Sequence, residues 1–335
     1  MKSNRISYID IAKGLGIILV VLGHVNNDQY AIKWIYSFHM PLFFYLSGYT
    51  FFSDKNENLQ QFIRKKFRNI MIPYFSFALI SYFFWLFSEI NNKDSVLYKP
   101  LIGIIYGVGT IEWMGFNLVL WFLPCLFITL SIFKVLSDGD SRTYKVILIL
   151  VCLFILFASR RLNIRLPWSI DIVPVGLCFL AAGYCARFVK RSNKSKHWKN
   201  LFLLLTLISS IGISMLNVRV DMNSLIYGKF YLFFLAAYTG ILLIISISKI
   251  IISNRVFEFL GKNSLIIMCT HDPIKRILFK LIPIFLDVNI SVIRQSIVKS
   301  IIITIIIILI ITPIIHIVNK YFPVLLGNKN DNIKR

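Results

Sequence analysis

The chain has 335 residues, of which 57% are hydrophobic and 16% are charged. A soluble domain would carry about 25% charged residues, so the composition argues against a soluble globular protein. The formal net charge is +22, but most Lys and Arg flank long apolar runs, where the positive-inside rule explains them better than nucleic-acid binding does. We therefore expect an all-α integral membrane protein with no nucleic-acid partner.

Taken in chain order, the apolar runs predict a single bundle of about ten transmembrane helices, because each span needs about 20 apolar residues. The predicted spans are residues 7–26, 32–52, 70–88, 117–135, 145–159, 170–188, 200–217, 228–248, 263–286 and 296–318. The larger share of Lys and Arg falls on the side that holds both termini, which places the termini in the cytoplasm. We expect one domain over residues 1–320, a short cytoplasmic tail over 321–335, and a multi-pass location in the cell (inner or plasma) membrane.

Two segments depart from this pattern. Residues 100–109 are too short to span, and they are expected to form either a re-entrant or interfacial piece or a flexible loop. Gly103 and Gly107 in this segment have the small-residue spacing that lets helices approach closely. The span 263–286 contains Asp272-Pro273, which predicts a bent helix.

The first span carries three ionisable residues, Asp10, Lys13 and His24. A charged side chain at the membrane centre costs at least about 2.5 kcal/mol, so we expect these groups to face the bundle interior. Lys13 and His24 share a helix face and lie roughly 16 Å apart along the axis. Asp10 lies one turn before Lys13 and can pair with it. The alternative is that Asp10 and Lys13 snorkel to the inner boundary and that His24 marks the outer interface.

Two further histidines fall at membrane depth. His39 enters the second span from the outer side and can approach His24, because consecutive helices are usually neighbours. His271 precedes Asp272, and this pair is either functional or closes a kink. Imidazole is the usual general base near neutral pH, so His24, His39 and His271, with Asp10, are the candidate catalytic residues. A hydrogen-bonded structural role is an equally good interpretation of His39.

A basic run on the inner side includes Lys65 and Arg68. These cations can hold the phosphates of a cytosolic nucleotide-like donor. From charge alone, anchoring to anionic lipid head groups is the favoured interpretation. Glu112 and Asp171 lie near the outer ends of spans and are candidate acceptor contacts. The five cysteines form no Cys-x-x-Cys pair, so we expect no metal site.

Assembled in order, these motifs resemble the membrane-bound acyltransferase 3 family, especially its short, single-domain branch of fucose 4-O-acetylase-like sugar O-acetyltransferases. The resemblance covers almost the whole chain. Its strongest part is a basic residue, ten intervening positions and a histidine, here Lys13 and His24; most members carry arginine instead of the lysine. Residues 65–68 are similar to the family's R-x-x-R motif, with lysine in the first position. Residues 38–49, and His271 with the segment before it, are similar to other family landmarks.

The resemblance implies transfer of an acyl group, usually acetyl, from cytosolic acyl-CoA to a hydroxyl of an extracytoplasmic glycan or lipid-linked sugar. Lys13, Lys65 and Arg68 would bind the donor, and His24 would deprotonate the acceptor hydroxyl or first carry the acyl group itself. Acyl-CoA would be a co-substrate, with no permanently bound cofactor, and membrane lipids would surround the bundle. The rival hypotheses are a multi-spanning transporter or flippase for a lipid-linked or polar substrate, and a catalytically idle partner subunit.

Overall fold

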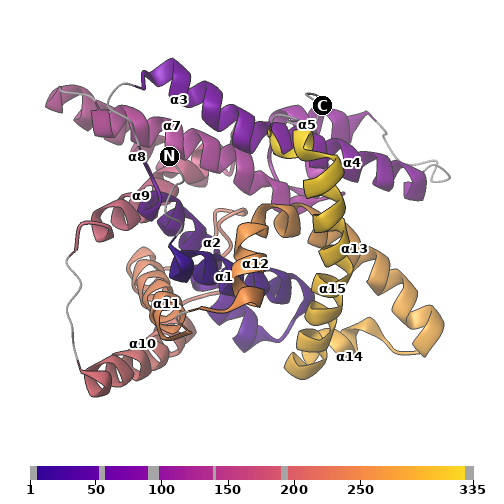
Figure 1. Cartoon of the computed structure of the whole chain (residues 1–335). Helices are drawn as coiled ribbons and strands as arrows, with labels where there is room; N and C mark the ends of the chain where they lie inside the picture. The colour runs from indigo at the N-terminus through magenta and orange to yellow at the C-terminus, as the bar shows by residue number, and fades with distance from the viewer. Residues whose placement is uncertain are drawn as a thin grey trace. The chain divides into compact units, whose positions relative to one another are not determined.

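A computed structural model describes residues 6–52, 57–89, 98–138, 141–189, 195–251 and 253–328, which consist of helices and their connecting loops (Figure 1). Over these ranges the β structure is limited to an isolated bridge between Asp221 and Ile226. The prediction of an all-helical fold is therefore confirmed.

The helical elements follow one another with short connections. Those of the first half are α1 (Ser7–Val25), α2 (Gln29–Tyr49), α3 (Leu59–Lys66), the π-helix η1 (Phe67–Met71), α4 (Ile72–Glu89), α5 (Lys99–Tyr106), α6 (Ile111–Met114), η2 (Leu118–Trp121) and α7 (Phe122–Asp138). Those of the second half are α8 (Arg142–Leu162), η3 (Pro167–Ile172), α9 (Val173–Ala186), α10 (Lys196–Leu216), α11 (Phe230–Ile251), α12 (Arg255–Lys262), α13 (Ser264–Leu286), α14 (Ile290–Gln295), α15 (Ile297–Tyr321) and η4 (Pro323–Leu326).

Seven helical segments of the described chain are long and apolar enough to cross a bilayer. They are Ser7–Val25, Leu59–Phe87, Leu118–Asp138, Pro167–Ala186, His197–Leu216, Phe230–Ile251 and Ile297–Tyr321. The other three predicted spans fall on α2, α8 and α13, which are helices of 21, 21 and 23 residues. These three lie outside the group of seven, so the count of ten stays a prediction, as do the single bundle and the cytoplasmic termini.

Two predicted helices differ in extent from their sequence patterns. The span expected at 145–159 belongs to a longer helix, Arg142–Leu162, because the apolar run continues into basic residues that remain helical. The bend expected at Asp272-Pro273 is not a break, since α13 runs without interruption through Pro273 and Pro283.

Residues 100–106 of the short segment 100–109 lie in the helix α5, and residues 107–109 follow it as a turn and loop. Gly103 lets the helix approach α6 closely, because a Cβ there would clash with the backbone carbonyl of Trp113. Gly107 does not serve the close helix approach that its spacing predicted; it ends α5 instead. Its φ of +69° is the left-handed conformation that ends α5, a position that favours glycine.

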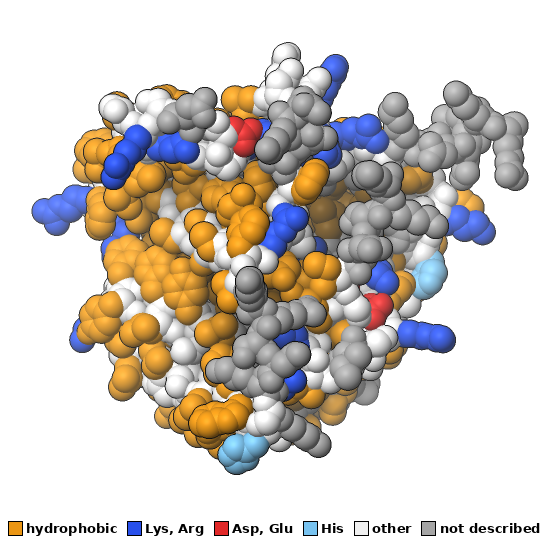
Figure 2. Space-filling view, turned by 60° about the vertical axis from the view of Figure 1, so that its left-hand side comes forward, with side chains coloured by type: hydrophobic (Ala, Val, Ile, Leu, Met, Phe, Trp, Pro, Cys, Tyr) orange, Lys and Arg blue, Asp and Glu red, His pale blue; other side chains and the backbone are white. Residues whose placement is uncertain are grey.

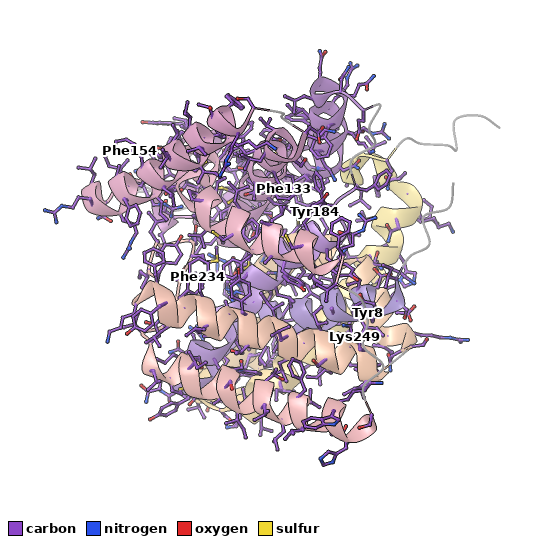
Figure 3. The ribbon with its side chains drawn as sticks, turned by 90° about the vertical axis from the view of Figure 1, so that its left-hand side faces the viewer. Tyr8, Phe133, Phe154, Tyr184, Phe234 and Lys249 are labelled. Carbon is purple, nitrogen blue, oxygen red and sulfur yellow. The ribbon has the colours of Figure 1, made fainter. Side chains whose placement is uncertain are left out.

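Large hydrophobic side chains remain exposed along several helices. Phe154 of α8, Leu204 of α10 and Leu309 of α15 are 71%, 52% and 64% exposed. Hydrophobic side chains cover much of the face drawn in Figure 2, while Lys and Arg lie mostly towards its edges. Phe154 projects away from the ribbon in Figure 3. Apolar exposure on this scale indicates surfaces that contact lipid rather than water.

The chain divides into two compact units. Unit 1 contains residues 1–50 and 179–311, and unit 2 contains residues 51–178 and 312–335. The predicted division at residue 320 into a domain and a tail stays a prediction, and residues 329–335 of that tail lie outside the described residues.

In unit 1, α1 is the central element and packs against α2, α11, α12 and α13. Glycines permit the closest of these approaches. A Cβ on Gly14 would clash with the carbonyl oxygen of Phe257 in α12, and a Cβ on Gly261 would clash with that of Asp10 in α1. The Nζ of Lys249 in α11 lies 5.4 Å from the centroid of the Tyr8 ring in α1 (Figure 3).

In unit 2, the core forms where α4, α5 and α7 meet the shorter elements. Tyr74 of α4 is fully buried, and its hydroxyl donates a 2.6 Å hydrogen bond to the carbonyl of Ile104 in α5. The buried Lys134 of α7 pairs with Asp138 at 2.5 Å, and its ammonium lies 5.5 Å from the Phe62 ring. This pairing explains how a lysine is accommodated in an otherwise apolar helix.

Candidate active site

The first helix places Asp10, Lys13 and His24 as the spacing predicts. It is continuous from Ser7 to Val25, so Lys13 and His24 lie on one helix at different depths. The Asp10 side chain is buried, whereas Lys13 and His24 are partly exposed. One end of α1 therefore presents a cation and the other end presents an imidazole. The predicted pairing of Asp10 with Lys13 stays a prediction.

His24 and His271 lie side by side. Their ring centroids are 5.2 Å apart and the ring planes are tilted by 45°. His24 comes from the last turn of α1 and His271 from α13. The sequence marked both residues separately, and the packing of α13 on α1 brings them together.

The hydrogen bonds of His271 assign its tautomer. Its Nδ1 lies 3.0 Å from the carbonyl oxygen of Ile267, one turn earlier in α13. A carbonyl only accepts, so Nδ1 carries the proton and Nε2 keeps a free lone pair. That Nε2 is buried and has no hydrogen-bond partner among the described residues. His271 therefore directs an unused acceptor into the interior of unit 1, beside the His24 ring.

His39 completes a group of three imidazoles through an aromatic neighbour. Its Nδ1 donates to the carbonyl of Ile35 at 2.9 Å, and the side chain is buried. The Tyr36 ring lies 4.8 Å from the His39 ring and 6.1 Å from the His24 ring, in edge-to-face geometry with both. The structure thus brings His24, His39 and His271 into one cluster, with Tyr36 between two of them.

Asp272 does not orient the neighbouring His271. Its buried carboxylate is bound by two cations of the same helix, Lys275 at one oxygen and Arg276 at 2.9 Å from the other. These are the i,i+3 and i,i+4 positions at which helical side chains meet. The carboxylate therefore neutralises charge within α13, and the Ile267 carbonyl fixes the imidazole.

The N-terminal end of α1 is held by α12. The Ser7 hydroxyl donates a 2.7 Å hydrogen bond to Glu258, which also accepts from Lys262 at 3.4 Å. The Ser7 hydrogen bond holds the pKa of the Glu258 carboxyl below its ordinary value. Together with the contacts of Gly14 and Gly261, these bonds fix the turn of α1 that carries Asp10 and Lys13.

The predicted donor residues Lys65 and Arg68 belong to unit 2. Lys65 is exposed in α3 and pairs with Glu57 at 3.1 Å. Arg68 lies in the π-helix η1, where its Nε donates a hydrogen bond to the carbonyl of Gly327. A π-turn is rare and is often found at functional sites. Both cations are accessible enough to meet a phosphate group, and each would first release the partner named here.

The two weak acceptor candidates also lie in unit 2, each in an ion pair. Glu112 is exposed and bonds Lys99 at 2.8 Å. Asp171 is fully buried and bonds Arg165 at 2.5 Å, while its Oδ1 has no hydrogen-bond partner among the described residues. Both residues therefore belong to a different compact unit from the histidine cluster. Within the described ranges, no group of three or more His, Cys, Asp and Glu is placed to hold a metal ion.

Comparison with known proteins identifies the family. The model of the acyltransferase 3 family, an acyltransferase domain, matches residues 6–318. The chain belongs to the acyltransferase 3 family. With its seven long apolar segments, it is a multi-pass membrane protein, and the family recognised from its motifs is confirmed.

Two curated relatives of this acyltransferase 3 chain bear the name nodulation protein NolL. The one from Mesorhizobium japonicum is 28% identical over 200 residues, covering 56% of this chain and 48% of that protein. The one from Sinorhizobium fredii is 47% identical over 58 residues, covering 14% of this chain and 16% of that protein. The matches thus span half or less of these relatives' length. No solved structure matches the chain.

Three features of this acyltransferase 3 cluster were not anticipated from its sequence. The sequence does not distinguish Tyr36 from the many other aromatic residues of the same span. Arg219, whose guanidinium carbon lies 4.4 Å from the Tyr36 ring centroid, sits in a loop and resembles an ordinary flanking charge. The pairing of Asp272 with Lys275 and Arg276 had a visible signal, because helical spacing alone predicts it.

Proposed function

We propose that this chain is a membrane O-acyltransferase that moves an acyl group, acetyl in the simplest case, from acyl-CoA to a sugar hydroxyl of an extracytoplasmic or lipid-linked glycan. The His24–His271 pair supports this function. His24 is a partly exposed imidazole, and the described residues give it no hydrogen bond. Beside it, His271 offers a bare Nε2. In a member of an acyltransferase family, such a pair is suited to proton transfer at a hydroxyl.

In the proposed reaction, His24 accepts the proton of the acceptor hydroxyl as the oxygen attacks the thioester carbon. The new C–O bond forms, the C–S bond to coenzyme A breaks, and the proton passes from His24 to the leaving thiolate. In a two-step version, a ring nitrogen of His24 attacks the thioester carbon and the C–S bond breaks, which releases the thiolate. The acceptor hydroxyl then attacks the acyl-imidazolium, the C–N bond breaks, and the hydroxyl proton passes to the thiolate. In both, the Nε2 of His271 is suited to accept a hydrogen bond from the second ring nitrogen of His24, which would orient the base.

Lys13, Lys65 and Arg68 are proposed to bind the phosphates of the donor near the cytosolic surface. Lys13 lies on the same helix as His24 but roughly 16 Å away along its axis, a length suited to an extended donor arm. Acyl-CoA would then be a co-substrate in a protein without a permanently bound cofactor, located in the cell membrane among lipids. Asp10 would hold Lys13 in place.

Arg68 provides a test of donor binding. Replacing it with alanine is expected to raise the KM for acetyl-CoA by about 10-fold to 100-fold, because a hydrogen bond to a charged group contributes roughly 1.5–3 kcal/mol. The measurement is steady-state transfer with varied acetyl-CoA. Arg64→Ala removes an exposed arginine of the same basic run and should change KM by less than about twofold, as a surface charge does. Equal effects of the two substitutions would assign the run to lipid anchoring.

A transporter or flippase is the second candidate, favoured by the buried ion pairs that Asp272 forms within α13. The two functions separate in one experiment on purified protein. An acyltransferase should hydrolyse or bind acetyl-CoA and add an acyl mass to a glycan acceptor detected by mass spectrometry. If acetyl-CoA neither binds nor turns over, transport is favoured.

A further inference from the structure

The loop between α10 and α11, residues 217–229, has a defined conformation. The Asn217 side chain donates to the carbonyl of Tyr227 at 2.9 Å and accepts from the backbone N–H of Lys229 at 3.0 Å. Asp221 and Ile226 exchange two backbone hydrogen bonds of 2.7 and 2.9 Å. Buried Tyr227 anchors the loop from inside. These hydrogen bonds hold the backbone of the loop that carries Arg219.

The loop places Arg219 on the histidine cluster. Its guanidinium carbon lies 4.4 Å from the centroid of Tyr36, and Tyr36 contacts both His24 and His39. The Arg219 residue is exposed. Arg219 also forms a side-chain hydrogen bond with Tyr36, and because a guanidinium has five N–H donors, others stay available to a further acceptor.

The charges around the cluster include that of Asp221, two residues further along the loop, which acts on the same Tyr36 as Arg219 does. Lys275 and Arg276 share Asp272, which neutralises much of their charge. In the part of the chain that the structure describes, no carboxylate forms an ion pair with Arg219. A cation that is positioned, exposed and outside the ion pairs of the described residues, one aromatic ring from a proposed catalytic imidazole, indicates a binding site for an anion.

We propose that Arg219 and Tyr36 form an acceptor subsite for an oxyanion, a carboxylate or a phosphate, carried by the acceptor close to the hydroxyl that is acylated. The link between this subsite and acyl transfer rests on the proposed function. Guanidinium binds both anions through two parallel N–H···O bonds. With the anion held at Arg219, a hydroxyl on the neighbouring part of the acceptor would meet His24. Tyr36 would lie between the bound anion and that hydroxyl. The acceptor class is thus an acidic sugar or a sugar on a phosphate-linked lipid.

The test uses the purified full chain in detergent and three probes. They are an oligosaccharide containing glucuronic acid, the same oligosaccharide with its carboxyl reduced to the alcohol, and this reduced oligosaccharide attached to polyprenyl diphosphate. Binding is measured by isothermal titration, and acyl transfer from acetyl-CoA is measured separately. Wild type should bind at least one anionic probe tenfold or more tighter than the neutral one. The anionic probe that is preferred identifies the carboxylate or the phosphate as the source.

Arg219→Gln should remove this preference, and Arg219→Lys should restore part of it, because lysine keeps the charge but lacks the planar fork. Lys229→Gln removes an exposed cation of the same loop and should leave the preference unchanged. The subsite is overturned if no probe binds, if the neutral probe binds as well as both anionic ones, or if Arg219→Gln retains the preference. Arg219-dependent binding without acyl transfer would support the subsite and reject the proposed function. Transfer without an Arg219-dependent preference would support the proposed function and reject the subsite.

Discussion

Replacing His24 with alanine is expected to lower acyl transfer by about 10²-fold to 10⁴-fold, the usual contribution of a general base. The reason is geometric. His24 is the partly exposed member of the imidazole cluster, while His39 and His271 are buried and bound through Nδ1 to backbone carbonyls. Neither neighbour can turn to replace the lost base without breaking its own hydrogen bond. The measurement is transfer from acetyl-CoA at saturating donor, in purified protein.

His316→Ala is the matched control. His316 is exposed on α15, and its Nδ1 bonds the carbonyl of Thr312 at 2.9 Å, so it shares the backbone hydrogen bond of the other helical histidines but not their cluster. Its loss should leave turnover within about twofold, as for a surface substitution. Wild-type turnover in the His24 variant would remove the imidazole from the mechanism and leave the transporter hypothesis in a stronger position.

Gly261→Ala is expected to destabilise the protein by about 1–3 kcal/mol, the range for overpacking a close contact. The added Cβ would meet the carbonyl oxygen of Asp10 in α1, which is backbone and cannot rotate away. To relieve the clash, α1 and α12 must separate near the turn that carries Lys13. We therefore expect a lower unfolding temperature together with weaker binding of acetyl-CoA. Both can be followed in detergent at a fixed heating rate, since membrane proteins often unfold irreversibly.

Gly212→Ala provides the comparison for the same chemical change. No atom lies within 4 Å of a Cβ built at Gly212 in α10, so alanine is expected to stabilise that helix by roughly 0.5–1 kcal/mol. If both substitutions shift the unfolding temperature equally, the tight α1–α12 contact has no special energetic role.

The best-predicted part of the molecule is the first helix. Its apolar run ends near Val25, and the cost of placing Asp10 and Lys13 in a bilayer predicted that both face the interior; Asp10 is buried and Lys13 is partly exposed. Hydropathy alone was sufficient there, because the run has clear polar ends. It was less successful for α8, whose helix extends into basic residues that hydropathy assigns to loops.

The cluster around His24 could be predicted only in part. Histidines in apolar segments contrast with their surroundings, so His24, His39 and His271 could be named one by one. Their meeting depends on the packing of α13 against α1, which a single sequence does not encode as a local pattern. The contribution of Arg219 depends on the hydrogen bonds that shape its loop, and these join residues that have no periodic relation.

The π-turn at Phe67–Met71 affects how the basic motif is compared with those of other proteins. A π-turn contains one more residue than an α-turn, and a single residue corresponds to about 100° of rotation around a helix. Deleting one residue here would restore a regular helix and turn Lys65 to another azimuth relative to α4, although the residue types of the motif could stay the same. Two proteins with the same basic tetrad would therefore direct their cations differently if only one of them has the inserted residue.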